Sequence, residues 1–350
     1  MPAVLASGYH GPPELTPVRA LTEWTFDPWA LTVLILVAAL YLVGLRRARR
    51  TGLAWPASRL FAFFGGGIGL AGIAVSSFLA VYWPVLFYVR AVQTIVLLLG
   101  VPLFVAIGRP LTLTIAAAPR LGPRIQRVID GRLARLLTFP AITGMVLVLT
   151  PFLLYFTPWY AAGLRIGGVR ELTYVAALLP GLVFFWTLLR VDPVPRQYPY
   201  LVSLWVTGAE VVGDAVLGLA VIADRNLIAG PYYHALARPW GPSLASDQVL
   251  GGGALWILGD LIGLPFLAAV LIAMIREDES QARTIDAELD ARDAAAAAAA
   301  VPGADLAEPD TEQVGASGAV PAVVQPPWWE SDPRFAERFS PVEPCQPGGQ

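Results

Sequence analysis

Residues 253–275 read GALWILGDLIGLPFLAAVLIAMI, and Asp260 is the only charged side chain in this run. A helix needs about 20 mainly apolar residues to cross the hydrocarbon core of a bilayer, which is roughly 30 Å thick. The charged stretch REDESQARTIDAELD follows at once and is typical of a helix that continues into water. The run therefore predicts a membrane span that ends near Ile275.

Six more segments have the length and composition of a membrane span. They are residues 28–46, 59–82, 85–107, 138–158, 172–190 and 200–223. The whole chain is 56% hydrophobic and 14% charged, with a mean hydropathy of +0.61, whereas soluble domains contain about 25% charged residues. This composition and a single cysteine exclude a disordered chain, a nucleic-acid binder and a secreted disulfide scaffold. We predict an all-α bundle of seven transmembrane helices in a lipid bilayer, with the second and third separated at Tyr82-Trp83-Pro84.

The distribution of arginines predicts the orientation of the bundle. With the N-terminus outside, the short cytoplasmic loops hold 14 arginines and the outer segments hold five, as expected from the positive-inside rule. Residues 276–350 contain 15 acidic and five basic side chains. We therefore expect an external segment at 1–27, a membrane domain at 28–275, a charged cytoplasmic helix at 276–300 and a disordered acidic cytoplasmic tail at 301–350.

Four ionisable side chains fall within the predicted spans: Arg90, Glu210, Asp214 and Asp260. Each costs roughly 2.5–3.5 kcal/mol at the centre of a membrane helix, so such residues usually have a function or a partner. Glu210 and Asp214 are four residues apart and share one helix face. They form either a cation or proton site, or a buried ion pair with Arg90 that fixes the packing of the helices.

The sequence DQVLGGGALW at 247–256 opens the last span. Asp247 and Gln248 precede this helix, and we expect Asp247 to cap it and Trp256 to anchor it at the membrane interface. Gly251, Gly252 and Gly253 permit close contact with neighbouring helices, as does the GxxxG spacing of Gly259 and Gly263. We interpret this motif as structural.

The supply of metal ligands and of catalytic groups is poor. The chain has two histidines, both outside the predicted spans, with three methionines and one cysteine. Copper and zinc sites are built mostly from these side chains, so we assign no metal ligand. The spans also contain no pairing of a nucleophile with a base, which predicts that the protein is not an enzyme.

The stretch PYYHALARPWGPSLASDQVLGGGALWILGD at 231–260 resembles the caa-type cytochrome c oxidase assembly factor family, CtaG, in its actinobacterial form. Further likeness lies in WPASRLFAFFGGG at 55–67, LLLGVPLFVAIGRPLTL at 97–113 and FFWTLLRVDP at 184–193. The resemblance implies a multi-pass protein of the bacterial plasma membrane that helps to mature a haem-copper oxidase. It also implies contact with oxidase subunits and a role in delivering copper.

The resemblance further implies histidines at several positions where this chain has other residues. An HxxxH-type pair of the family corresponds to Arg90 and Thr94, with Gln93 retained, and a third histidine corresponds to Asp214. The candidate polar site inside the membrane consists of Arg90, Gln93, Thr94, Glu210, Asp214 and Asp260. Two functions stay open: an assembly factor that acts by contacts, or a small transporter or pathway for protons or cations.

Overall fold

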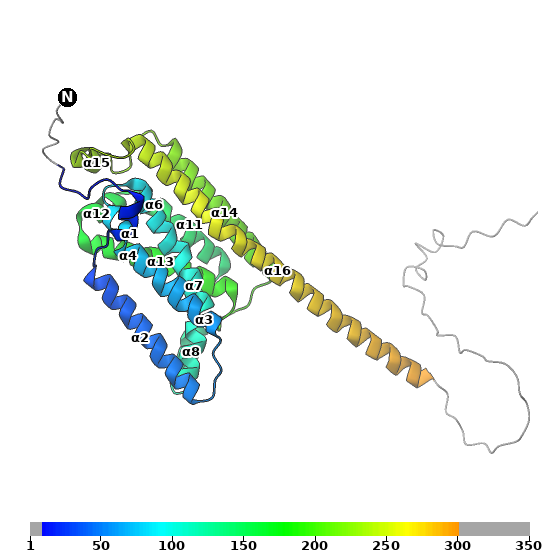
Figure 1. Cartoon of the computed structure of the whole chain (residues 1–350). Helices are drawn as coiled ribbons and strands as arrows, with labels where there is room; N and C mark the ends of the chain where they lie inside the picture. The colour runs from blue at the N-terminus through cyan, green and yellow to red at the C-terminus, as the bar shows by residue number, and fades with distance from the viewer. Residues whose placement is uncertain (1–8, 301–350) are drawn as a thin grey trace, which may run out of the picture. The chain divides into compact units, whose positions relative to one another are not determined.

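The computed structural model describes residues 9–300, and every regular element in that range is helical (Figure 1). This confirms the all-α class. The chain divides after Glu288 into two units, and the body that ends there holds all the predicted spans. The tail predicted at 301–350 lies outside the described residues.

The spans follow one another along the chain with short connecting helices. In order, they are α2 (Pro28–Arg50); α3 (Ala57–Phe61), η1 (Ala62–Gly69), α4 (Leu70–Ser76) and α5 (Phe78–Tyr82); α6 (Phe87–Ile95), η2 (Val96–Gly100) and α7 (Val101–Ile107); α11 (Pro140–Phe156) and α12 (Trp159–Arg165); α13 (Gly167–Leu189); α14 (Tyr200–Ala223); and α16 (Leu244–Ala300). The shorter helices are α1 (Pro17–Thr22), α8 (Pro110–Ala117), α9 (Gly122–Ile129), α10 (Arg132–Leu137) and α15 (Gly230–Leu236).

Six of the seven predicted spans are helical stretches long and apolar enough to cross a membrane. The remaining one, the fourth in chain order, is a pair of helices with a bend between them. The two parts of that pair, α11 and α12, meet at an angle of 65°. The bend falls at Thr157, whose backbone is extended because Pro158 follows it and disfavours a helical conformation. The predicted separation of the second and third spans is also confirmed, since α5 ends at Tyr82 and α6 begins at Phe87.

The last helix is longer than the predicted span at both ends. It begins at Leu244 because Ser243 lies at its N-terminus, where the Ser243 hydroxyl accepts a hydrogen bond from the Ser246 amide at 3.2 Å. It continues without a break beyond Ile275, so the charged stretch after the span is helical as predicted. The orientation of the termini across the membrane stays a prediction.

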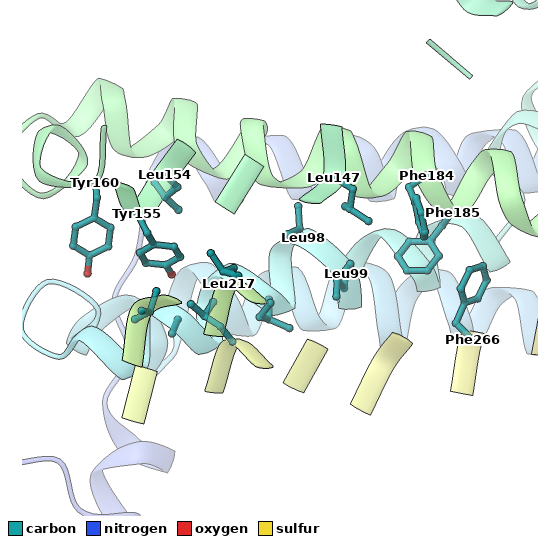
Figure 2. Close-up of a cluster of buried hydrophobic side chains, with 14 of the residues drawn as sticks. Leu98, Leu99, Leu147, Leu154, Tyr155, Tyr160, Phe184, Phe185, Leu217 and Phe266 are labelled. Carbon is teal, nitrogen blue, oxygen red and sulfur yellow. The ribbon is translucent and has the colours of Figure 1, made fainter. Parts of the chain in front are cut away.

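The helices pack with their polar positions inside and many large apolar side chains outside. On α14 the buried face carries Ser203, Thr207, Glu210 and Asp214, whereas Trp205 is 74% exposed. This arrangement fits a bundle whose surroundings are lipid, because a polar side chain facing lipid would lose its hydrogen bonds. The interior between α6, α11, α13, α14 and α16 is otherwise filled by leucine and aromatic side chains (Figure 2).

Candidate functional site

Arg90, Gln93 and Thr94 form one hydrogen-bonded group inside the bundle. Each is at most 4% exposed, and their spacing places them on one face of α6. The Arg90 Nη1 donates to Gln93 Oε1 at 2.6 Å, and Gln93 Nε2 donates to the Ala74 carbonyl oxygen at 2.7 Å. The Thr94 hydroxyl donates to the Arg90 carbonyl oxygen at 2.9 Å and lies 3.0 Å from the Tyr155 hydroxyl. This part of the predicted polar site therefore exists as a unit.

The charge of Arg90 is stabilised by aromatic rings and not by a carboxylate. Its guanidinium carbon lies 4.8 Å from the centre of the Trp83 ring and 5.8 Å from the centre of the Tyr174 ring. Such cation–π contacts strengthen when the cation is removed from water. Within residues 9–300 no ion pair joins Arg90 to Glu210, Asp214 or Asp260. Of the two alternatives for the carboxylates, the ion pair with Arg90 is wrong, because α6 turns Arg90 toward Gln93 and the two rings.

Glu210 and Asp214 form a second group, on the face of α14 that packs against α16. Both side chains are buried, at 2% and 4% exposure. A methyl group at Gly259 would lie 2.8 Å from Asp214 Cγ, and one at Gly263 would lie 3.0 Å from Glu210 Oε2. The GxxxG spacing therefore permits the close contact that the sequence predicts, and what approaches the two glycines is a pair of carboxylates.

Asp260 lies on α16 between Gly259 and Gly263, the two glycines that the α14 carboxylates approach. Its side chain is hydrogen-bonded within its own helix. Its Oδ2 accepts a hydrogen bond from Trp256 Nε1 at 2.7 Å. Three buried carboxylate oxygens have no hydrogen-bond partner in the described part of the chain: Glu210 Oε2, Asp214 Oδ2 and Asp260 Oδ1. Unpartnered buried carboxylate oxygens are costly, so a proton or a cation is the expected neutralising species. The anchoring role of Trp256 stays a prediction.

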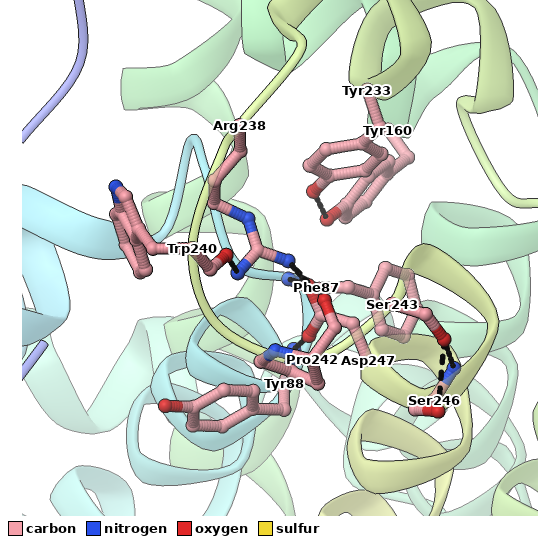
Figure 3. Close-up of polar contacts among 10 residues, drawn as sticks. All are labelled: Phe87, Tyr88, Tyr160, Tyr233, Arg238, Trp240, Pro242, Ser243, Ser246 and Asp247. Carbon is pink, nitrogen blue, oxygen red and sulfur yellow. Dashed lines mark hydrogen bonds and ion pairs between the residues drawn. The ribbon is translucent and has the colours of Figure 1, made fainter. Parts of the chain in front are cut away.

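Asp247 stabilises the start of α6, 160 residues earlier in the chain (Figure 3). Its Oδ2 accepts from the Phe87 amide at 3.1 Å and its Oδ1 from the Tyr88 amide at 3.0 Å. The prediction that Asp247 caps its own helix is wrong, because Ser243 takes that position. The first amides of α6 have no side-chain cap from their own segment, and Asp247 supplies one.

Arg238 completes this contact and was missed by the sequence reasoning (Figure 3). Its Nη2 lies 3.2 Å from Asp247 Oδ2, and the side chains of both residues are 2% exposed. The guanidinium also donates to the carbonyl oxygens of Trp240 at 2.6 Å and Pro242 at 2.9 Å. The loop before α16 is thereby folded around one arginine. The only signal in the sequence is that Arg238 and Asp247 flank the tryptophan-glycine-proline turn.

Gln248 closes the end of α14. Its Oε1 accepts from the Ile228 amide at 2.8 Å. Its Nε2 lies within hydrogen-bond distance of the carbonyl oxygens of Val221, Asp224 and Asn226, at 3.1–3.2 Å. Asp247 and Gln248 together tie the last helix to the beginning of α6 and to the end of α14, which supports a structural role for the motif.

Two of the three glycines that follow make the close contacts predicted for them. A methyl group at Gly251 would lie 2.6 Å from the Phe87 ring, and one at Gly252 would lie 2.8 Å from the Gly218 carbonyl oxygen. Gly253 has open space at the same position. The backbones of α14 and α16 therefore meet at Gly218 and Gly252, and the carboxylates lie along the same interface.

A pair of tyrosines joins α12 to the short helix α15. The hydroxyls of Tyr160 and Tyr233 are 2.6 Å apart (Figure 3). Burial raises the pKa of the Tyr233 hydroxyl, so both groups stay neutral and share a hydrogen bond. The Tyr160 ring packs on Tyr155, which contacts Thr94, so aromatic side chains connect the Arg90 group with α15. The sequence reasoning did not identify these tyrosines.

The residues of this bundle match one known family along most of their length. A sequence profile of the cytochrome c oxidase caa3 assembly factor family matches residues 39–277, which contain the Arg90 group, the carboxylates and the Asp247 contact. The chain belongs to this family. The resemblance seen in the sequence is thereby confirmed. No solved structure matches the chain.

Curated relatives from mycobacteria share less of their length with it. Proteins of Mycobacterium leprae, Mycobacterium bovis and Mycobacterium tuberculosis, each named only as uncharacterized, are 28% identical to this chain over 291 residues. The matched region covers 81% of this chain and 44% of each relative. The chain thus spans less than half the length of the curated relatives it matches.

Proposed function

We propose that this protein is an integral-membrane factor for the assembly of a haem-copper cytochrome c oxidase in a bacterial plasma membrane. It acts by contact with oxidase subunits and catalyses no reaction. The family match over the membrane domain carries this proposal. The Asp247 and Gln248 contacts support it, because they give the outer end of the bundle a fixed shape on which a partner can assemble.

The exposed helix α2 offers a surface for such a partner. Only 11% of the residues in the apolar 18-residue stretch of this helix are buried in the bundle. Ile35 and Leu40 are 68% and 63% exposed and project from the helix along its length. Helices associate in lipid mainly by packing, so a weakly covered helix is available to a subunit during assembly.

The side chains at the positions where the family resemblance implies histidine do not suit copper binding. Arg90 occupies one such position, and a guanidinium carries hydrogen-bond donors but no free lone pair for a metal. Among the described residues, no group of three histidine, cysteine, aspartate or glutamate side chains is placed to hold a metal ion. The carboxylates of Asp214 and Glu210 are hard ligands, whereas Cu(I) prefers sulfur and imidazole. We therefore propose that the chain serves assembly without holding copper at these positions.

Deletion of the gene is expected to lower the amount of assembled oxidase. Haem a content from reduced-minus-oxidised spectra and cytochrome c oxidase activity should both fall in isolated membranes. Expression of the full chain should restore both. A chain with Glu210→Gln and Asp214→Asn should restore them as well, because these changes preserve shape and leave the contact surface intact. Normal oxidase spectra and activity in the deletion strain would refute the proposal.

A pathway for protons or hard cations is a second candidate, favoured by the three unpartnered carboxylate oxygens of Glu210, Asp214 and Asp260. In proteoliposomes, the wild-type chain should then carry a flux above that of empty liposomes. The Glu210→Gln, Asp214→Asn variant should reduce it to the empty level, since neither amide ionises to release a proton or to attract a cation. Asp130→Asn, outside the spans, is the matched control and should not change the flux. The absence of any wild-type flux of protons, sodium or potassium would eliminate this candidate.

A further inference from the structure

An apolar groove of about 560 Å³ lies between α7, α13 and the short helix α9. Ligand sites in proteins commonly have volumes of roughly 300–1,000 Å³. Its walls include Val105 of α7 and Leu182, Val183 and Trp186 of α13. Val105 and Leu182 are only partly buried although they belong to packed helices, so the groove opens at the surface of the bundle. That surface faces lipid in a membrane.

The helix α9 closes one side of the groove and is amphipathic. Ile129 is buried and Ile125 is partly buried, while Arg124, Gln126 and Arg127 are exposed. A short helix with an apolar face and a basic face lies at the boundary between headgroups and acyl chains. Val128, which is 73% exposed, lines the groove from this helix. The groove therefore leads from the headgroup level into the hydrocarbon region.

The charge around the opening selects one kind of lipid. Residues 109–135 contain six arginines and one acidic side chain, Asp130. Arg124 and Asp192 are the charged residues that line the groove. Asp192 is buried and its carboxylate accepts hydrogen bonds from the Leu111 and Thr112 amides and the Thr112 hydroxyl, whereas Arg124 is exposed. A second apolar groove, of about 410 Å³ between α2 and α13, is lined by Glu171 and by no basic residue. Only the first groove combines apolar walls with a group that attracts a phosphate.

We propose that the groove between α7, α9 and α13 binds an anionic phospholipid, with an acyl chain along Val105, Leu182 and Val183 and the phosphate beside Arg124. The shape and charge of this groove support the binding of such a lipid independently of the proposed function. Arginines next to a cytoplasmic surface attract anionic headgroups, and the arginine count predicts that this end of the bundle lies on that side. The bound lipid fixes α9 against the bundle.

The full chain, purified in detergent, is titrated with phosphatidylglycerol and with phosphatidylcholine of the same acyl chains. Bound lipid is counted by native mass spectrometry, and the unfolding temperature is followed, because a ligand that binds the folded state raises it. The wild type should prefer phosphatidylglycerol. Arg124→Gln should bind it about fivefold more weakly, the factor expected for the loss of one arginine beside an anionic headgroup.

Two further variants distinguish the groove from general surface charge. Arg127→Gln makes the same charge change on the same helix, outside the groove, and should keep the wild-type preference. Val128→Trp should fill the opening and weaken the binding of both lipids. Equal binding of the two lipids by the wild type overturns the proposal, as does an equal loss in Arg127→Gln and Arg124→Gln. Unchanged binding in Val128→Trp also overturns it. Each variant is first checked for the wild-type unfolding temperature without lipid.

Discussion

Replacement of Asp247 by alanine is expected to lower the free energy of unfolding by about 3–5 kcal/mol. The carboxylate accepts hydrogen bonds from the Phe87 and Tyr88 amides and pairs with Arg238. The variant leaves a buried guanidinium without its counter-ion and two helix amides without an acceptor. Reversible unfolding in mixed detergent micelles, followed by tryptophan fluorescence, measures the loss.

The contribution of the ion pair is separated by a double-mutant cycle. Arg238→Gln should also destabilise the protein, and the double variant with Asp247→Ala should lose less than the sum of the two single losses. Asp247→Asn keeps one acceptor and should lose less than Asp247→Ala. A loss below about 1 kcal/mol for Asp247→Ala, the value of an ordinary exposed pair, would contradict the structural role.

The sequence predicted the importance of the 247–256 motif better than its contacts. Apolar length located the spans, and the glycines at 251 and 252 signalled a close approach that the structure confirms. The partner of Asp247 was out of reach, because Phe87 is 160 residues away and only the packing of the helices brings the two together. A capping residue looks the same in a sequence whether it caps its own helix or another.

The charged groups show the same limit in a different way. Residue type and depth left two alternatives open for Glu210 and Asp214: a cation or proton site, or a buried ion pair with Arg90. The rotation of α6 instead directs Arg90 to Gln93 and to the Trp83 ring, and the buried ion pair of the described residues joins Arg238 to Asp247. Helix rotation is set by the packing of small and large residues, which a single sequence does not reveal.

Replacement of Gly181 by alanine is expected to destabilise the bundle near the upper end of the roughly 1–3 kcal/mol range for overpacking. The added methyl group would overlap the Leu98 carbonyl oxygen of η2 and would lie 2.7 Å from Pro102 Cγ. A backbone oxygen and a proline ring have no rotamer to which they can move. The span made of α6, η2 and α7, which carries Arg90, Gln93 and Thr94, would have to shift as a whole.

Gly208→Ala is the matched control for Gly181→Ala, with the opposite expected sign. Gly208 also lies within a membrane span, but apart from its chain neighbours and the backbone of its own helix no atom lies within 4 Å of the position its methyl group would take. Alanine there should stabilise the helix by about 0.5–1 kcal/mol, because it restricts the unfolded chain and fills no occupied space. Unfolding of both variants in the same micelles therefore tests the packing directly. Equal effects of the two substitutions would mean that α13 does not approach η2 as closely as the structure shows.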